Sequence, residues 1–290
     1  MIKLLGLVSV ALIALAGCVA VPDEPEPDVV EVVPPPPPEP EIVEPEPPGF
    51  DLSLYSIDDP NSLWVVVNKL RPLTPIDFAP ADLVAPNVPA AFDPLMRKEA
   101  SDALEQMYAE ASEAGVPFRI QSSYRSYTTQ QRVKANSVSR LGQEASDQRS
   151  ARAGYSEHQT GLAVDLTTPS GRCTLDACFA NTPEGEWLAA NAWRFGFILR
   201  YLEGRSDIHG YVFEPWHFRY VGPELAEEIH LQGNPTLEEL FGLDPAPTYV
   251  DAPTGGAPSP SDPAPDPPTD QAPLPGRDDA GEPDFPDDPD

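Results

Sequence analysis

The sequence predicts an α+β domain in which helices pack on a small antiparallel sheet, between acidic proline-rich segments expected to be disordered. Three observations lead to this fold class. Apolar residues recur at helical spacing early in the central region, and short apolar runs bounded by turn residues follow later. The 39 prolines gather at the two ends of the chain. Helices followed by strands favour an antiparallel sheet.

The central region divides into elements by periodicity and turn residues. Ser62–Lys69, with Leu63, Val65 and Val67 at alternate positions, predicts a strand. Pro94–Ala114 carries an apolar stripe at helical spacing, and Gly115 closes this predicted helix. Thr182–Glu184 combines a cap residue with a first-turn proline, so a helix is expected to begin there and to end near Gly196. The other expected elements are a strand over 117–123, a helix over 128–141, strands over 161–166, 197–201 and 211–221, and a helix over 223–232.

The first eighteen residues are typical of an export signal. Lys3 is followed by an apolar run that is too short to be a free-standing membrane span. The run ends in Leu15–Cys18, which resembles the lipobox of bacterial lipoproteins, where the cysteine is lipidated and becomes the first mature residue. Acyl chains on Cys18 would hold the protein on a membrane surface. The alternative is an ordinary signal peptide with an incidental cysteine.

Charge and proline separate the ends of the chain from its centre. Residues 19–48 hold nine acids and no base, and residues 250–290 hold eleven acids and only Arg277. Proline favours an extended chain and like charges repel, so both ends are expected to stay solvated. The net charge of −29 opposes binding to nucleic acid. The expected organisation is a lipoprotein signal peptide over 1–17, a linker over 18–49, a folded domain over 50–245 and a disordered tail over 246–290.

The first of three polar patches runs from Ser156 to Asp165. His158 and Asp165 lie seven residues apart, and Asp165 closes an apolar run. A buried aspartate is costly unless it is paired or bound to a metal, and imidazole with carboxylate suits zinc. Taken alone, a core histidine and a capping aspartate explain this pair better.

The second patch places Glu214 three residues before His217, among large aromatic side chains. With His217 as a third ligand, two histidines and one carboxylate would leave an open position, as in catalytic zinc sites. Glu214 could then lie beside a water molecule and accept its proton. The alternative is a strand-end glutamate in a surface salt bridge.

The third patch runs from Ser122 to Gln130 and centres on Arg125, which follows an expected strand and precedes an expected helix. A guanidinium flanked by tyrosines and hydroxyls is suited to a bidentate bond with a carboxylate, such as the free end of a peptide. It could also stabilise a developing oxyanion. The alternative is a surface arginine paired with a neighbouring acid.

Taken in order, the three patches resemble the VanY-type D-alanyl-D-alanine carboxypeptidases of the LAS group of zinc peptidases. The resemblance covers roughly residues 62–241. It implies one zinc ion per chain, carried by the sheet and bound by His158, Asp165 and His217. It also implies Glu214 as the general base and a catalytic role for Arg125. The substrate contacts that it implies are Ser156, Gln130 and Tyr127.

The activity implied by the resemblance is a zinc-dependent D,D-carboxypeptidase that removes the terminal D-alanine from peptidoglycan stem peptides. The expected protein is a monomer, outside the cytoplasm and lipid-anchored to a bacterial membrane. An L,D-carboxypeptidase acting on tetrapeptide stems is an alternative, because relatives with the same motifs cut one residue further in. A zinc-bearing cell-wall binding module without turnover is another. Glu214 argues against the module, because binding alone needs no base.

The remaining histidines and cysteines receive structural interpretations. His209 is expected at the rim of the site without a role, with substrate contact as the alternative. His230 is expected to face solvent or to act as a cation at a helix end. Cys173 and Cys178 are expected to form a disulfide in an exported protein, because a thiolate metal site would need two more cysteines.

Overall fold

A computed structural model describes residues 50–250 of the chain. The signal peptide, the lipidation site at Cys18, the linker over 18–49 and the tail beyond residue 250 therefore lie outside the described residues. Within 50–250, no helix combines the length and the apolar character that crossing a bilayer requires.

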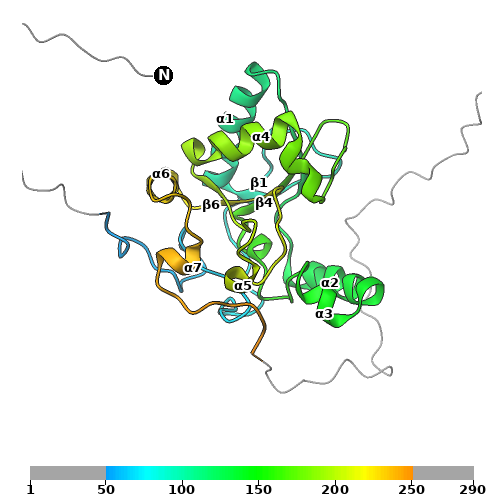
Figure 1. Cartoon of the computed structure of the whole chain (residues 1–290), viewed down its shortest axis with the longest axis vertical. Coiled ribbons are helices and arrows are strands. Elements are labelled where there is room, and N and C mark those ends of the chain that lie inside the picture. The colour runs from blue at the N-terminus through cyan, green and yellow to red at the C-terminus, as the bar shows by residue number, and fades with distance from the viewer. Residues whose placement is uncertain (1–49, 251–290) are drawn as a thin grey trace, which may run out of the picture. The chain divides into compact units, whose positions relative to one another are not determined.

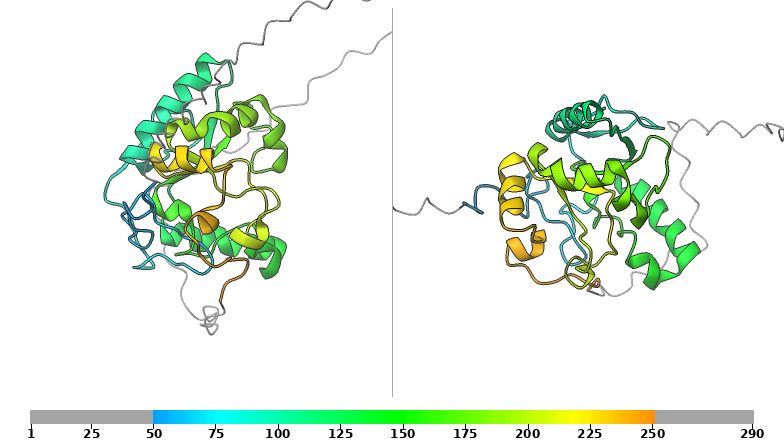
Figure 2. Two further views of the ribbon diagram at one scale, coloured as in Figure 1. Left: turned by 60° about the vertical axis from the view of Figure 1, so that its left-hand side comes forward. Right: turned by 45° about the horizontal axis from the view of Figure 1, so that its top comes forward.

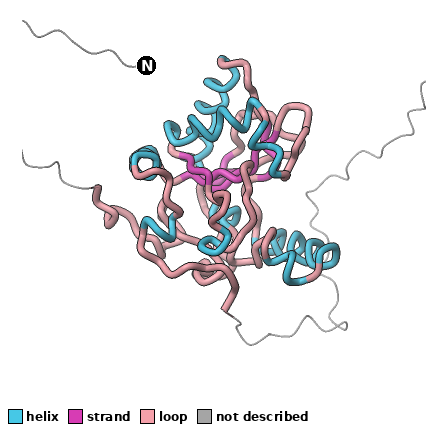
Figure 3. Tube along the Cα trace, viewed as in Figure 1, coloured by secondary structure: helices cyan, strands magenta, loops and turns pink. Residues whose placement is uncertain are grey.

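A four-stranded antiparallel sheet with the strand order β3-β4-β6-β5 forms the centre of the domain (Figure 3). A second sheet pairs β1 with β2. The strands are β1 Leu83–Val84, β2 Met96–Arg97, β3 Arg119–Ser122, β4 Ala163–Thr167, β5 Phe197–Leu199 and β6 His217–Tyr220. The predicted α+β class with an antiparallel sheet is confirmed.

Helices α1 and α4 lie together on one side of this sheet (Figure 1), while α2 packs against α3 and lies apart from α6 and α7 (Figure 2). The α-helices are α1 Lys98–Glu113, α2 Tyr127–Leu141, α3 Gln143–Asp147, α4 Pro183–Asn191, α5 Ser206–His209, α6 Pro223–Leu231 and α7 Leu237–Leu240. Three short 3-10 helices are η1 Glu157–Thr160, η2 Ala177–Asn181 and η3 Ala192–Phe195.

The two central strands separate an apolar face from a polar one. Side chains alternate along a strand, so Leu166 of β4 and Phe218 of β6 point into the main core, where they are fully buried with residues of α1. Asp165 and His217, one position away, point to the opposite face. These two residues are direct partners in the register of β4 and β6. The sheet therefore carries a core on one face and a polar cluster on the other.

The predicted helices form where caps and apolar stripes indicate them. The stripe of α1 is buried against the sheet, and this helix gives way at Ala114 to Gly115, whose φ is +79°. At the start of α4 the Thr182 hydroxyl accepts the Gly185 N–H, and Pro183 occupies the first turn. Both signals can be recognised from local sequence, which is why these predictions hold.

The strand predicted over Ser62–Lys69 is wrong, although its alternation is real. Val65 and Val67 belong to the main core, whereas Trp64 and Val66 belong to a second core under α6. The segment is thus buried on two sides without a strand partner, apart from a single bridge at Asn68. Its carbonyls are satisfied by side chains instead, because the Arg219 guanidinium donates to the carbonyls of residues 63 and 65.

The strand predicted over Tyr211–Val221 is correct only in its last part, because β6 begins at His217. Pro215 lacks an N–H and interrupts any ladder there. The preceding chain is a loop whose backbone bonds other loops, with Val212 N–H donating to Gln148 O and Glu214 N–H to Tyr201 O.

The predicted disulfide between Cys173 and Cys178 is present. It closes a small loop that follows β4 and extends into η2.

Candidate active site

His158 lies in η1 with its ring held in one tautomer. Its Nδ1 is 2.7 Å from the carbonyl oxygen of Ser123. A carbonyl only accepts, so Nδ1 carries the proton and the lone pair of Nε2 remains available. That Nε2 lies 3.2 Å from Oδ2 of Asp165. The histidine is therefore oriented towards the polar face of the sheet.

The η1 turn is itself fixed by its neighbours. The Gln159 side chain accepts the Gly154 N–H at 3.0 Å and donates to the carbonyl of Ile76 at 2.9 Å. Gly161 ends the turn with φ at +70°, and a Cβ there would lie 3.0 Å from side chains of β1 and β2. Gln159 and Gly161 thus hold the turn that presents His158.

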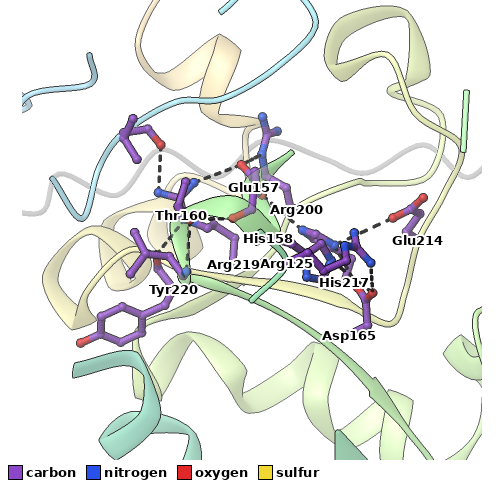
Figure 4. A network of polar contacts seen from close by, with 12 residues as sticks. Arg125, Glu157, His158, Thr160, Asp165, Arg200, Glu214, His217, Arg219 and Tyr220 are labelled. Carbon is purple, nitrogen blue, oxygen red and sulfur yellow. Dashed lines mark hydrogen bonds and ion pairs between the residues drawn. The ribbon is translucent and has the colours of Figure 1, made fainter. Parts of the chain in front are cut away.

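His217 is held from both sides by carboxylates. Its Nδ1 is 3.0 Å from Oδ1 of Asp165, and its Nε2 is 3.2 Å from Oε2 of Glu157. Figure 4 shows His217 beside Asp165, with Glu157, Arg200 and Arg219 to the left of them. A proton donated from Nε2 to Glu157 leaves Nδ1 to face Asp165 and His158, as metal ligation requires.

These three residues form a candidate metal centre. One ligand atom each from His158, Asp165 and His217 lies within 4.8 Å of the others, and all three residues are buried. A tetrahedral zinc ion with bonds of about 2.1 Å needs ligand atoms about 3.4 Å apart. The distances of 3.2 Å from His158 Nε2 to Asp165 Oδ2 and of 3.0 Å from His217 Nδ1 to Asp165 Oδ1 are close to that spacing. The donor set and its geometry therefore fit zinc.

The ionisation of the two histidines differs in the metal-free protein. Burial lowers the pKa of His158 to about 4, and the charge of Arg125 acts in the same direction. Burial also opposes a charge on His217, but its hydrogen bonds to Asp165 and Glu157 raise its pKa to about 9. A cation ligated by Nδ1 would have to displace a proton from the His217 ring, so metal binding should weaken as pH falls.

Glu157 heads a buried charge network that sequence analysis did not identify. Its carboxylate is 2.8 Å from Arg200 Nε and 3.1 Å from Arg219 Nη1, and all three side chains are fully buried. Arg200 is paired further with Glu238 at 2.7 Å. Burial raises the pKa of Glu157, but the two arginines outweigh burial and hold that pKa well below its usual range. The network fixes the carboxylate that holds His217.

Glu214 lies at the open side of the metal centre. Its Oε2 is 4.0 Å from His217 Nδ1, which is too far for a hydrogen bond but close enough for one small molecule to contact both groups. Burial raises the pKa of Glu214 to about 8, against the charge of His217. The carboxyl group is thus placed beside the centre without being one of its three converging ligands.

A cavity of about 280 Å³ opens onto this centre. Its walls include Arg125, Ser156 and Tyr201 together with the three candidate ligands and Glu214. Arg125 donates from Nη1 to the Ser122 hydroxyl at 3.0 Å, and its buried Nε has no partner among the described atoms. The guanidinium is therefore held at the cavity with donor capacity to spare.

Comparison with known proteins gives a family. Residues 93–223 match the VanY family model, described as D-alanyl-D-alanine carboxypeptidase. The putative carboxypeptidase YodJ of Bacillus subtilis is 40% identical over 193 residues, which cover 65% of this chain and 70% of YodJ. The chain belongs to the VanY carboxypeptidase family. Two further curated relatives are covered over only 44% and 53% of their own length.

Solved structures of relatives of this VanY-family chain are named for two different cleavage specificities, L,D and D,D. The LdcB LD-carboxypeptidase is 40% identical with a TM-score of 0.59, over 63% of this chain and 87% of LdcB. The D,D-pentapeptidase VanY from a VanB-type resistance cassette, solved with Zn(II), is 32% identical with a TM-score of 0.51. That match covers 62% of this chain and 98% of VanY.

In this VanY-family domain not every expected site residue reaches the cavity. The Gln130 side chain is buried and donates to the Ala151 carbonyl at 2.8 Å, and Tyr127 begins α2. Neither residue is among the described cavity walls. Tyr201 lines the cavity instead, with its ring 4.7 Å from that of His217. As the last residue of a strand predicted over 197–201, it gave no signal of a role in the site.

The other two histidines have structural surroundings. His209 is fully buried rather than at a rim, so that expectation is wrong: one ring nitrogen bonds the Leu202 carbonyl and the other accepts the Tyr211 N–H. Burial lowers the pKa of His209 to about 4. His230 lies in the last turn of α6 and stacks on Trp193 with ring centroids 4.1 Å apart.

Proposed function

We propose that this protein is a zinc-dependent carboxypeptidase that removes the terminal D-alanine from peptidoglycan stem peptides, with the D,D bond of the pentapeptide as its first target. The observation that carries the proposal is the convergence of His158, Asp165 and His217 beside Glu214, on one cavity with Arg125. The family description and the Zn(II)-bound VanY relative support it.

In this proposal His158 Nε2, His217 Nδ1 and one Asp165 oxygen hold the zinc ion. When bound, zinc supplies polarisation of the scissile carbonyl and activation of water. Glu214 accepts the proton of the attacking water and later donates a proton to the nitrogen of the departing D-alanine. A neighbouring divalent cation lowers the pKa of Glu214 from its metal-free value of about 8, which favours the proton-accepting form at neutral pH.

The proposed role of Arg125 is to bind the terminal carboxylate of the peptide or to stabilise the developing oxyanion. Its planar fork suits either task, whereas lysine offers only a point charge. We expect Arg125→Lys to lower kcat/KM by roughly tenfold or more, with zinc content unchanged. A rise in KM alone would indicate carboxylate binding, and a fall in kcat alone would indicate oxyanion stabilisation. Unchanged steady-state kinetics would contradict both roles.

Cleavage of the L,D bond in tetrapeptide stems is a second candidate. It is favoured by the higher identity to LdcB, 40% against 32% for the D,D-pentapeptidase. Defined pentapeptide and tetrapeptide stems, digested separately and read by mass, test both. Conversion of pentapeptide to tetrapeptide supports the first candidate, and conversion of tetrapeptide to tripeptide supports the second. Failure to cut either stem with zinc present would refute the proposed function.

We also propose that the protein is exported and anchored through lipidated Cys18. The motif at Leu15–Cys18 supports this location. A Cys18→Ser variant is expected to leave the membrane fraction and to keep its activity on soluble peptides. Continued partition with membranes would count against lipidation as the anchor.

A further inference from the structure

Part of the cavity wall is cationic, in a protein whose net charge is −29. Arg140 and Arg149 both line it, from the end of α2 and from the segment after α3. The α2 wall residues Val133, Ser137 and Arg140 recur at helical spacing, so one face of the helix is turned to the cavity. Two arginines in the cavity wall of so acidic a chain need an explanation from the ligand that the cavity binds.

These two arginines have no acid partner in the part of the chain that the structure describes. Asp147, the acid nearest to Arg149 in sequence, is already paired with Lys134 at 2.5 Å and with Arg152 at 2.9 Å. The side chains of Arg140 and Arg149 make no hydrogen bond or ion pair with another residue within 50–250, and both are exposed. Their donors are therefore available to a ligand in the cavity.

The segment that carries Arg149 is held against α2 by two hydrogen bonds. Lys134 donates to the Ser150 carbonyl at 2.8 Å, and Gln130 donates to the Ala151 carbonyl at 2.8 Å. Both donors are buried side chains of α2. The backbone beside Arg149 is thus fixed against the helix that carries Arg140, so the two guanidinium groups belong to one surface.

Two of the three acids that line the cavity are already engaged. Glu157 is neutralised by Arg200 and Arg219, and Asp165 is held by the two histidines. Only Glu214 remains, and the charge of Arg149 acts on it. A peptide whose end lies at the metal centre would therefore pass its upstream residues along a positive wall.

We infer that Arg140 and Arg149 bind a carboxylate of the stem peptide upstream of the scissile bond, which makes the enzyme selective for acidic stems. The inference rests on the proposed function but not on which bond is cut. Two carboxylates can supply this chemistry: the side-chain carboxylate of meso-diaminopimelate at the third position, which lysine lacks, and the α-carboxylate of the γ-linked D-glutamate, which isoglutamine lacks.

Four matched stems test the inference, combining diaminopimelate or lysine at the third position with D-glutamate or D-isoglutamine at the second. At low ionic strength, wild-type kcat/KM is expected to favour the carboxylate in at least one of the two pairs by roughly fivefold. The preference should shrink in 0.5 M salt, because exposed charges are then screened over about 4 Å. The pair that shows it identifies the carboxylate.

The Arg140→Gln/Arg149→Gln double variant is expected to reduce that ratio to about one while cutting the stem with lysine and D-isoglutamine as well as the wild type does. Arg132→Gln is the matched control, because Arg132 is an exposed arginine of the same helix that does not line the cavity. It should leave the ratio unchanged. An unchanged ratio in the double variant, or an equal loss on all four stems, would overturn the inference.

Hydrolysis of any stem by the wild type separates this inference from the proposed function. If no stem is cut, the proposed function fails, and calorimetric dissociation constants for the four stems still decide the inference. The same roughly fivefold preference and the same loss in the double variant are then expected in binding. Equal affinity for all four stems would overturn it.

Discussion

Replacing Glu214 by glutamine is expected to lower kcat by about 10²- to 10⁴-fold, the usual contribution of a general base. The amide keeps the size of the side chain but cannot accept a proton from water. Glu214 lies 4.0 Å from His217 Nδ1 and outside the three converging ligands, so zinc content should stay near one per chain. Single-turnover kinetics on the preferred stem, with metal analysis of the same samples, measures both quantities.

The control for this experiment is Glu203→Gln, a change of the same size at an exposed position that does not line the cavity. It should leave kcat unaltered. Near-normal hydrolysis by Glu214→Gln would mean that another residue is the base, and the proposed mechanism would have to be withdrawn. Loss of zinc together with activity would instead indicate that Glu214 is needed to hold the metal.

Replacing Glu157 by alanine is expected to lower the free energy of unfolding by about 3–5 kcal/mol, because it leaves buried charges without their partner. Arg219 has no other carboxylate partner among the described residues and would retain only its bonds to carbonyl oxygens. Arg200 would keep Glu238. Urea unfolding in the presence of a chelator measures this loss in the free energy of unfolding without the contribution of bound metal.

Glu144→Ala is the matched control, because Glu144 is an exposed acid of α3. Its effect should stay within about 0.5 kcal/mol. Should Glu157→Ala fail to fold at all, Glu157→Gln can be measured in its place, because glutamine retains an acceptor for both arginines. Its free energy of unfolding should lie below that of Glu144→Ala and above that of Glu157→Ala. A loss below about 1 kcal/mol in Glu157→Ala would mean that the network adds little to stability.

Much of the fold could be predicted because its signals are local. The apolar stripe of α1, the Thr182 cap of α4 and the apolar run that becomes β4 can each be recognised within one short window of sequence. The segment Ser62–Lys69 shows where local signals fail. Its alternation reflects burial between two cores, and nothing in its own residues indicates that Arg219, 154 residues from Val65, replaces a strand partner.

The residues of the candidate site likewise divide into those that the sequence could predict and those that it could not. His158, Asp165, His217, Glu214 and Arg125 were found from motifs, and the structure brings them to one cavity. Glu157 was missed because a glutamate beside a histidine is ordinarily exposed, and only the distant Arg200 and Arg219 make its burial tolerable. Gln130 shares its motif with Arg125, but its side chain donates to the Ala151 carbonyl and does not line the cavity. Spacing along the chain identifies candidate residues, whereas their direction depends on packing.

The central claim is that His158, Asp165 and His217 form the zinc centre of this carboxypeptidase. The direct measurement is zinc per chain after purification and dialysis against zinc, for the wild type and for single alanine variants of the three residues. The wild type should hold one zinc ion, and each variant should lose most of it, because two ligands do not form a stable site. Full zinc retention in all three variants would contradict the claim.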